Sequence, residues 1–152
     1  MANSVCIHAS VAVQIVTDEE MSHLANALWV LWAQDRLQPI APSMFPYEVC
    51  SVLRKKVLLR GELTPEEERE AVNAFVDLDV QCRSPEGHLR RAWELARELN
   101  LPTVYDTAYL ALAQMEGCDF WTVDRRFYNT THERFPFVYW LGDFDISTPE
   151  VF

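Results

Sequence analysis

Along the whole chain, short apolar runs alternate with longer segments in which apolar residues recur at helical spacing. Runs rich in β-branched or aromatic residues predict strands at residues 4–7, 38–41, 120–123 and 137–141, and residues 80–82 form a further candidate. The run at 120–123 carries the strongest strand pattern and the run at 38–41 a weak one. These runs are separated by longer segments, so strands and helices are expected to follow one another in turn.

The longer segments place apolar residues three and four positions apart, which is the spacing of one helix face. Helices are predicted after Asp18, after Pro42, from Thr64-Pro65, from Ser84-Pro85, over residues 106–115 and, as a short element, after Asp124. Asp18 is expected to cap the first of these helices. Thr64, with Glu67 three positions later, forms the capping-box pattern.

Two predicted helices have informative faces. Residues 106–115 are apolar on nearly every side, which indicates a helix buried in the centre of the domain. The helix after Ser84-Pro85 is expected to bury one periodic face, made of Leu89, Ala92, Trp93, Ala96 and Leu99. Asn100 and Pro102 are expected to end that helix.

The alternation of strands and helices predicts one α/β domain with a mainly parallel sheet. A chain of 152 residues can form one domain with a hydrophobic core, but not two ordinary domains. We expect the domain to span residues 1–141 and the tail at 142–152 to be loosely ordered.

Composition and charge narrow the classes of function. No apolar run reaches the roughly 18 residues that cross a bilayer, and the first four residues lack the cationic start of a signal peptide. A cytoplasmic location without membrane association is therefore predicted. The formal net charge of −10 argues against non-specific coating of nucleic acid. It still allows an enzyme with a basic rim around an acidic site.

The cysteines are scattered and form no CxxC pair; they are Cys6, Cys50, Cys82 and Cys118. This spacing disfavours a zinc site. Each cysteine has apolar neighbours, so all are interpreted as reduced core residues.

Polar side chains follow the predicted strands where ligands bind in parallel sheets, at the carboxyl ends. These candidates are His8 and Ser10 after the first strand, Asp106 at the start of the buried helix, and Asp124 with Arg125 and Arg126 after the strand at 120–123. Glu48 lies beside the apolar face of the second predicted helix. Three carboxylates could thus converge, and their oxygens suit Mg²⁺ or Mn²⁺.

Each candidate also has an ordinary structural interpretation. Asp106 and Asp124 could be helix N-caps, which is a common role of Asp. Glu48 could be a solvated residue at the edge of its helix. His8 could be a structural hydrogen-bond donor. These alternatives remain open on the residues alone.

The order and separation of several motifs resemble a known family, the PIN domains. The motifs are VCIHAS at 5–10, APSMFPYEV at 41–49, GELTPE at 61–66, YDTAYLALA at 105–113 and WTVDRRF at 121–127. In this order they resemble the VapC-like toxins of toxin–antitoxin pairs, to about residue 141. The resemblance implies a three-layer α/β/α sandwich and a metal-dependent ribonuclease.

The resemblance also implies roles for individual residues. Glu48, Asp106 and Asp124 match the family acids that hold Mg²⁺ or Mn²⁺. Ser10 matches the hydroxyl residue two positions after the first acid, and Thr122 matches a supporting hydroxyl. Position 8 departs from the pattern, because the family has a metal-binding Asp where this chain has His8. A neutral imidazole can still bind a metal but favours Mn²⁺ over Mg²⁺, whereas an imidazolium would repel it.

Two hypotheses follow from this departure. The first is a metal-dependent endoribonuclease, weakened by His8, in which Arg125 or Lys55 steadies the phosphate. The second is a catalytically impaired PIN domain that binds RNA or an antitoxin. An unrelated phosphatase-like hydrolase is disfavoured because the chain shows no nucleophile motif. The resemblance further implies a homodimer and a VapB-like antitoxin, whose basic arm would suit the acidic protein.

Overall fold

The computed structural model describes residues 3–146, and its strands form one parallel sheet. The strands are β1 (Ser4–Ile7), β2 (Gln38–Ala41), β3 (Gln81–Cys82), β4 (Phe120–Thr122) and β5 (Val138–Trp140), in the spatial order β3-β2-β1-β4-β5. Every pairing between these strands is parallel. The predicted α/β class with a mainly parallel sheet is therefore confirmed.

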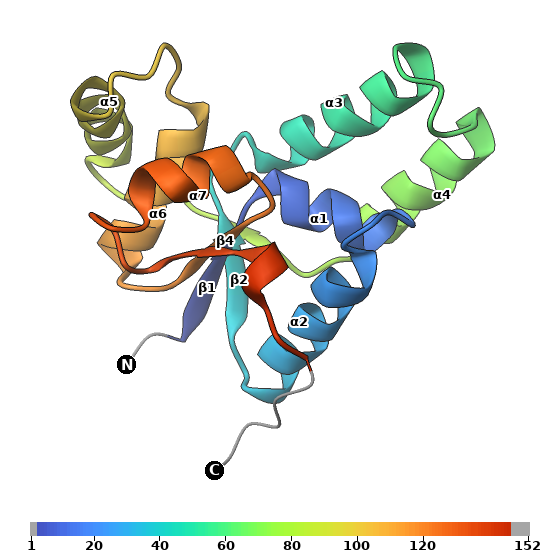
Figure 1. Ribbon diagram of the computed structural model, residues 1–152, viewed down its shortest axis with the longest axis horizontal. Coiled ribbons are helices and arrows are strands. Elements are labelled where there is room, and N and C mark those ends of the chain that lie inside the picture. Colours follow the sequence, from blue (N-terminus) through green and yellow to red (C-terminus); the bar gives the residue numbers. More distant parts are fainter. Residues whose placement is uncertain (1–2, 147–152) are drawn as a thin grey trace.

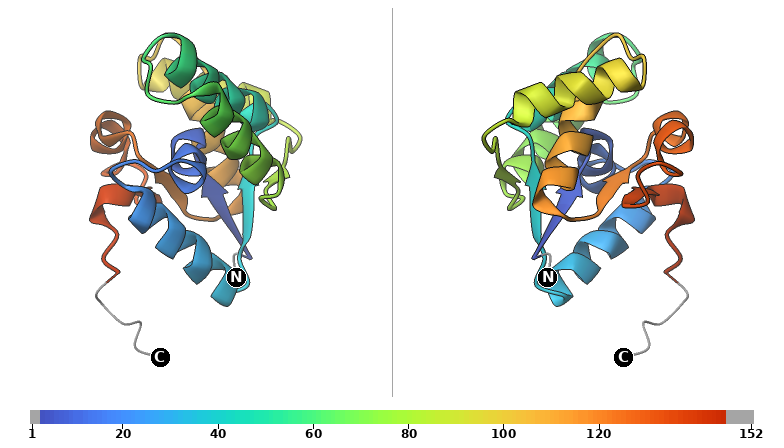
Figure 2. Two further views of the ribbon diagram at one scale, coloured as in Figure 1. Left: turned by 90° about the vertical axis from the view of Figure 1, so that its right-hand side faces the viewer. Right: turned by 90° about the vertical axis from the view of Figure 1, so that its left-hand side faces the viewer.

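Helices cover both faces of this sheet and complete a three-layer sandwich (Figures 1 and 2). They are α1 (Ala9–Val16), α2 (Ser22–Gln34), α3 (Phe45–Leu58), α4 (Pro65–Val76), α5 (His88–Glu98), α6 (Tyr105–Glu116) and α7 (Arg125–Thr131), and a 3₁₀ turn, η1, spans Leu141–Asp143. Helix α6 packs against β1 and β4, and α5 covers α6. Helices α3 and α4 pack together and extend beyond the sheet (Figure 1).

The core is centred on α6, as its apolar sequence predicts. Residues 107–113 of this helix are all buried. Tyr109, Leu110 and Leu112 are among the largest fully buried side chains. Burial on this scale explains why the helix forms despite its weak amphipathic pattern, since tertiary packing supplies most of a helix's stability in a protein.

Helix α1 was not predicted from the sequence. Its residues include several with β-branched side chains, such as Val11, Val13 and Ile15, which have weak intrinsic helix propensity. Val11, Ala12 and Val13 are nonetheless buried, and the His8 side chain caps the helix by accepting a hydrogen bond from the Ser10 N–H. Packing and capping here outweigh propensity.

The predicted start of α2 at Asp18 is wrong. The helix begins at Ser22 and has Met21 at its N-cap position, with no side-chain cap. The Ser22 hydroxyl instead accepts a hydrogen bond from the Glu19 N–H and donates one to the Thr17 carbonyl. The turn between α1 and α2 is therefore held by Ser22, and Asp18 is exposed.

The predicted start and face of α5 are also shifted. The helix begins at His88, preceded by Gly87 in the left-handed conformation, rather than at Ser84-Pro85. Its buried residues are His88, Ala92, Leu95 and Ala96, whereas Leu89 is 76% exposed and Trp93 is 47% exposed. By contrast, the capping box at Thr64 and Glu67 is confirmed at the start of α4.

The remaining predictions concern the cysteines and the tail. Cys6 and Cys118 are buried, but Cys82 is exposed on the short edge strand β3, so its assignment to the core is wrong. At the C-terminal end, η1 is followed by Phe144, whose ring contacts Trp121 edge-on at 5.9 Å. Residues 147–152 of the predicted loose tail lie outside the described residues. Over residues 3–146, no helix has the length and apolar character needed to cross a membrane.

Candidate functional site

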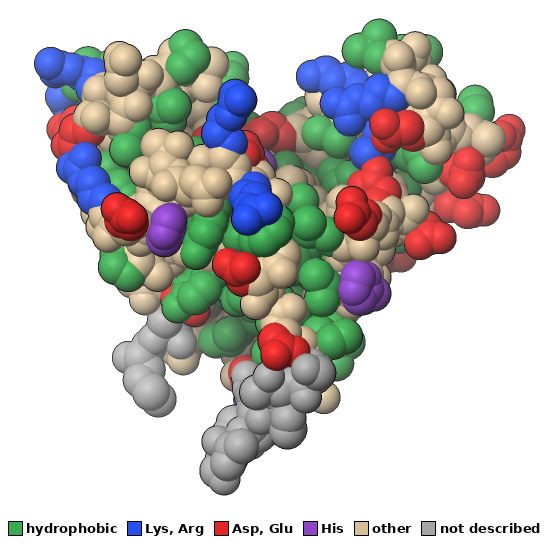
Figure 3. Space-filling model, viewed as in Figure 1, with side chains coloured by type: hydrophobic (Ala, Val, Ile, Leu, Met, Phe, Trp, Pro, Cys, Tyr) green, Lys and Arg blue, Asp and Glu red, His purple; other side chains and the backbone are tan. Residues whose placement is uncertain are grey.

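The candidate site lies at the topological switch point of the sheet, between β1 and its neighbours on either side. From β1 the chain builds β2 and β3 on one side, and it returns to add β4 and β5 on the other. Ligands of parallel sheets bind at such a switch point, beyond the carboxyl ends of the strands. Figure 3 shows that the surface there is hollowed between the lobe of α5 and α6 and the lobe of α3 and α4. We call this hollow the notch.

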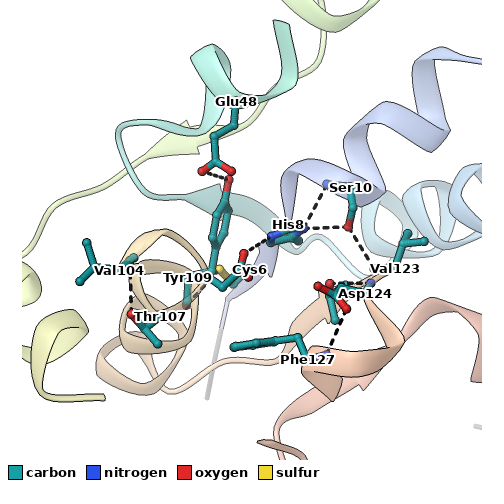
Figure 4. Close-up of polar contacts among 12 residues, drawn as sticks. Cys6, His8, Ser10, Glu48, Val104, Thr107, Tyr109, Val123, Asp124 and Phe127 are labelled. Carbon is teal, nitrogen blue, oxygen red and sulfur yellow. Dashed lines mark hydrogen bonds and ion pairs between the residues drawn. The ribbon is translucent and has the colours of Figure 1, made fainter. Parts of the chain in front are cut away.

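His8, directly after β1, is the centre of a hydrogen-bond network (Figure 4). Its Nε2 lies 3.0 Å from Asp106 Oδ1, and its Nδ1 lies 2.7 Å from Ser10 Oγ and 3.1 Å from the Ser10 N. Ser10 Oγ also accepts a hydrogen bond from the Val123 N–H at 3.0 Å. The network thereby joins the ends of β1 and β4 to the first turn of α6.

These contacts assign the tautomer of the His8 ring. Nδ1 accepts the Ser10 N–H, so it carries a lone pair rather than a proton. The proton of the neutral ring is then on Nε2, which donates to Asp106. The Ser10 hydroxyl donates to Nδ1 and accepts from Val123. Both ring nitrogens of His8 are therefore engaged by the protein.

Glu48 lies in the first turn of α3, half-buried at the notch. The Tyr109 hydroxyl donates to its Oε1 at 3.3 Å (Figure 4). Burial raises the pKa of the Glu48 carboxyl; His8 and the Tyr109 hydrogen bond oppose this shift, and the charge of Asp106 adds to it. Burial and the nearby Glu48 likewise raise the pKa of Tyr109, so Tyr109 remains a hydrogen-bond donor.

Replacing Glu48 by Gln is expected to stabilise the protein by a few degrees at about pH 7 and much less at about pH 4. The folded-state pKa of Glu48 is raised, so the folded protein holds this proton more tightly than the unfolded chain does. Stability is therefore lost as the pH rises from the unfolded to the folded pKa. Gln can still accept the Tyr109 hydrogen bond. The measurement is Tm at both pH values, with exposed Glu133→Gln as the control; an equal shift at both would contradict the expectation.

Asp124 and Thr122 hold the end of β4. Asp124 is the N-cap of α7, and its Oδ1 accepts the Phe127 N–H at 3.1 Å. The buried Thr122 hydroxyl accepts the Asp124 N–H at 3.0 Å, which orients the Asp124 backbone. Of the two acids interpreted as N-caps, Asp124 is one and Asp106 is not, because α6 begins at Tyr105 with Val104 at its N-cap position.

The two predicted phosphate-binding cations have different surroundings. The Arg125 guanidinium lies over the Trp140 ring at 4.7 Å from its centroid, a cation–π contact. Lys55, in the last turn of α3, is exposed. Arg125 is therefore fixed beside the end of β5, whereas Lys55 extends from the opposite lobe.

Tyr109 is the site residue that sequence reasoning missed. Its ring is fully buried, stacks on Phe120 at 5.8 Å and lies 4.6 Å from the His8 ring. One signal was available, since Tyr109 follows Asp106 by three positions on the same helix and so shares its face. In a helix apolar on nearly every side, however, an aromatic residue is read as core.

As they are arranged, these side chains do not fit a divalent ion. Carboxylate oxygens are the donors that Mg²⁺ prefers, and one oxygen of each of Asp106, Asp124 and Glu48 already accepts a hydrogen bond from the protein. His8 has no free ring nitrogen to offer. Within residues 3–146, no three His, Cys, Asp or Glu side chains are placed to hold a metal ion.

A comparison with protein families identifies the family to which this α/β fold belongs. Residues 5–133 match the PIN domain. The match covers most of the chain, so the protein belongs to the PIN domain family, whose members are generally nucleases and typically use divalent metals. No curated protein matches the chain.

Proposed function

We propose that this protein is an endoribonuclease of the VapC type whose cleavage is weak because His8 replaces a metal-binding Asp. Glu48, Asp106 and Asp124 are retained at the positions that the family pattern gives to its acids. The observation that carries the proposal is the contact between His8 Nε2 and Asp106 Oδ1 at the end of β1. This contact supports the proposal because it brings His8 against Asp106, one of the acids that the family pattern assigns to the metal.

The notch supports RNA as the substrate despite the net charge of −10. Figure 3 shows Lys and Arg side chains on both sides of the hollow. A basic rim attracts phosphates to an acidic centre even when the whole protein is negative. In this proposal Lys55 and Arg125 contact the RNA backbone from opposite sides. A divalent ion, Mg²⁺ or more favourably Mn²⁺, is the family cofactor that the remaining acids would use.

The proposal includes a protein partner and a second copy of the chain. A VapB-like antitoxin with a basic segment would be attracted by the acidic protein. The exposed Leu89 and Trp93 on α5 leave apolar surface that a homodimer could cover. A cytoplasmic location goes with this function. Sedimentation that gives a clean monomer at micromolar concentration would count against the dimer.

A second candidate function is a binding module without catalysis. It is favoured by the engagement of both His8 nitrogens and of every candidate acid by hydrogen bonds within the protein. In that case the notch would hold RNA or an antitoxin segment without cleaving it. The two candidates share the fold and the surface, and they differ in whether any RNA bond is broken.

Cleavage of a mixed RNA pool separates the two candidates. With Mn²⁺ above about 1 mM the unsubstituted protein should cleave slowly, because its remaining acids would bind the ion only weakly. Cleavage should be less in Mg²⁺ and absent in EDTA, and Asp106→Asn should abolish the activity because it removes one of the retained acids. Asn cannot supply the charge that a cation requires, although it nearly preserves the shape. Cleavage that survives both EDTA and Asp106→Asn would contradict the proposal. Binding of RNA without cleavage would favour the second candidate.

A further inference from the structure

The acids of the notch are bound by hydrogen-bond donors of the protein itself. His8 Nε2–H donates to Asp106, the Tyr109 hydroxyl donates to Glu48, and the Phe127 N–H donates to Asp124. Neighbouring carboxylates repel each other: burial is the main cause of the raised pKa of Glu48, and the charge of Asp106 adds to it. A nuclease centre relieves such repulsion with a cation. Here each carboxylate has a protein donor instead.

The position of His8 explains why it does not act as a metal ligand. A metal would need the lone pair of Nε2, and the proton of the ring would then move to Nδ1. Nδ1 lies 3.1 Å from the Ser10 N, whose hydrogen points at it. A proton on Nδ1 would face that hydrogen, and α1 would lose the side-chain cap at its N-terminus. Metal binding through His8 would therefore destabilise the N-terminus of α1.

Tyr109 holds Glu48 in a similarly fixed way. Its hydroxyl is carried on a ring that packs against the rings of His8 and Phe120, with centroids 4.6 Å and 5.8 Å away. The ring has no exposed surface, so the hydroxyl has little freedom to release the carboxylate. His8 and Tyr109 also contact one another, so the donors of Asp106 and Glu48 form one packed unit.

We propose that His8 and Tyr109 substitute for the cation, so that this PIN domain folds with a complete notch and without a divalent metal. His8 and Tyr109 are positioning residues in this account. This inference rests on the proposed function in one respect: both assume that His8 stands where the family has a metal-binding Asp. It concerns the stability of the protein and its metal affinity, and neither measurement requires RNA cleavage.

Thermal unfolding with and without metal tests the inference. The unsubstituted protein should have the same Tm, within about 1 °C, in EDTA, Mg²⁺ and Mn²⁺, because a ligand raises Tm only when it binds the folded state. The His8→Asp variant loses the donor to Asp106 and adds a carboxylate. Its Tm should fall in EDTA and rise by about 4 °C or more when Mn²⁺ is added.

His23→Asp is the matched control, because it makes the same substitution at an exposed residue of α2. It should show no Mn²⁺-dependent rise. Titration calorimetry of the unsubstituted protein with MnCl₂ gives an independent result that does not depend on whether a variant folds. No saturable binding is expected below about 1 mM. A Tm rise in Mn²⁺, or saturable binding by the unsubstituted protein, would overturn the inference. Failure to cleave RNA would overturn the proposed function and leave this inference standing.

Discussion

The His8→Asp variant should cleave RNA at least about a hundredfold faster than the unsubstituted protein in the same Mn²⁺ concentration. Asp replaces a neutral ring that donates to Asp106 with a carboxylate that repels it, and this repulsion favours a cation. The change restores the acid that the family pattern places at the end of β1. A difference of a few kcal/mol in the free energy of metal binding corresponds to a factor of this size. The measurement is the initial rate of cleavage of a mixed RNA pool.

The His8→Asp rate needs a control for a general change in net charge. His23→Asp alters the charge by the same amount but lies on the surface of α2, so its rate should equal that of the unsubstituted protein. Equal rates for His8→Asp and His23→Asp would contradict the assignment of position 8. The His8→Asp variant also changes the cap of α1, because the Asp carboxylate replaces the imidazole as acceptor of the Ser10 N–H. Its melting curve should therefore be recorded beside its rate.

Replacing Phe120 by Ala should lower the free energy of unfolding by about 3–5 kcal/mol. Phe120 is fully buried in β4, between β1 and β5. Its ring stacks on Tyr109 and meets the Phe127 ring edge-on. Removing it leaves a cavity beside the ring of Tyr109, whose hydroxyl donates to Glu48. The effect is measured by urea unfolding at neutral pH.

Phe120→Leu is the matched variant for this position. It retains most of the buried volume and should cost less than about 1.5 kcal/mol. Because β4 also carries Thr122, which orients Asp124, Phe120→Ala should in addition reduce any RNA cleavage at temperatures where the protein is still folded. A loss of stability under 1.5 kcal/mol for Phe120→Ala would contradict the central position of this ring in the core.

Most of the fold could be predicted because its signals are local. The β-branched run before His8, the aromatic run before Asp124 and the apolar helix at 106–115 each identify their element without tertiary information. Parallel strands joined by helices then allow few arrangements. A mainly parallel sheet follows from these elements. The three layers were expected from the family resemblance, and the strand order is seen only in the structure.

The elements that could not be predicted depend on contacts between distant residues. Helix α1 consists largely of weak helix formers and is held by burial and by the His8 cap. The orientation of α5 is set by packing on α6, where Leu95 and the His88 ring are buried and Leu89 is left exposed. The His88 Nε2 contact with the Ala108 carbonyl at 2.7 Å anchors that packing. No periodic pattern within α5 reveals it.

The acids of the candidate site could be named from the sequence, but their contacts could not be predicted from it. The family pattern selects Glu48, Asp106 and Asp124, and it identifies His8 as the departure. Only the structure shows that the imidazole donates to Asp106 and also caps α1. Tyr109 was hidden because its ring belongs to the core, and only its hydroxyl reaches the site.

The most direct test of the account is RNA cleavage by three proteins side by side: the unsubstituted chain, His8→Asp and the double variant His8→Asp/Asp106→Asn. All are assayed in Mn²⁺ and in EDTA. We expect weak cleavage by the unsubstituted chain and none by the double variant. In Mn²⁺, but not in EDTA, His8→Asp should cleave at least about a hundredfold faster than the unsubstituted chain. If His8→Asp cleaves no faster than the unsubstituted chain, or if the double variant retains the activity, position 8 does not control a nuclease centre and the account is wrong.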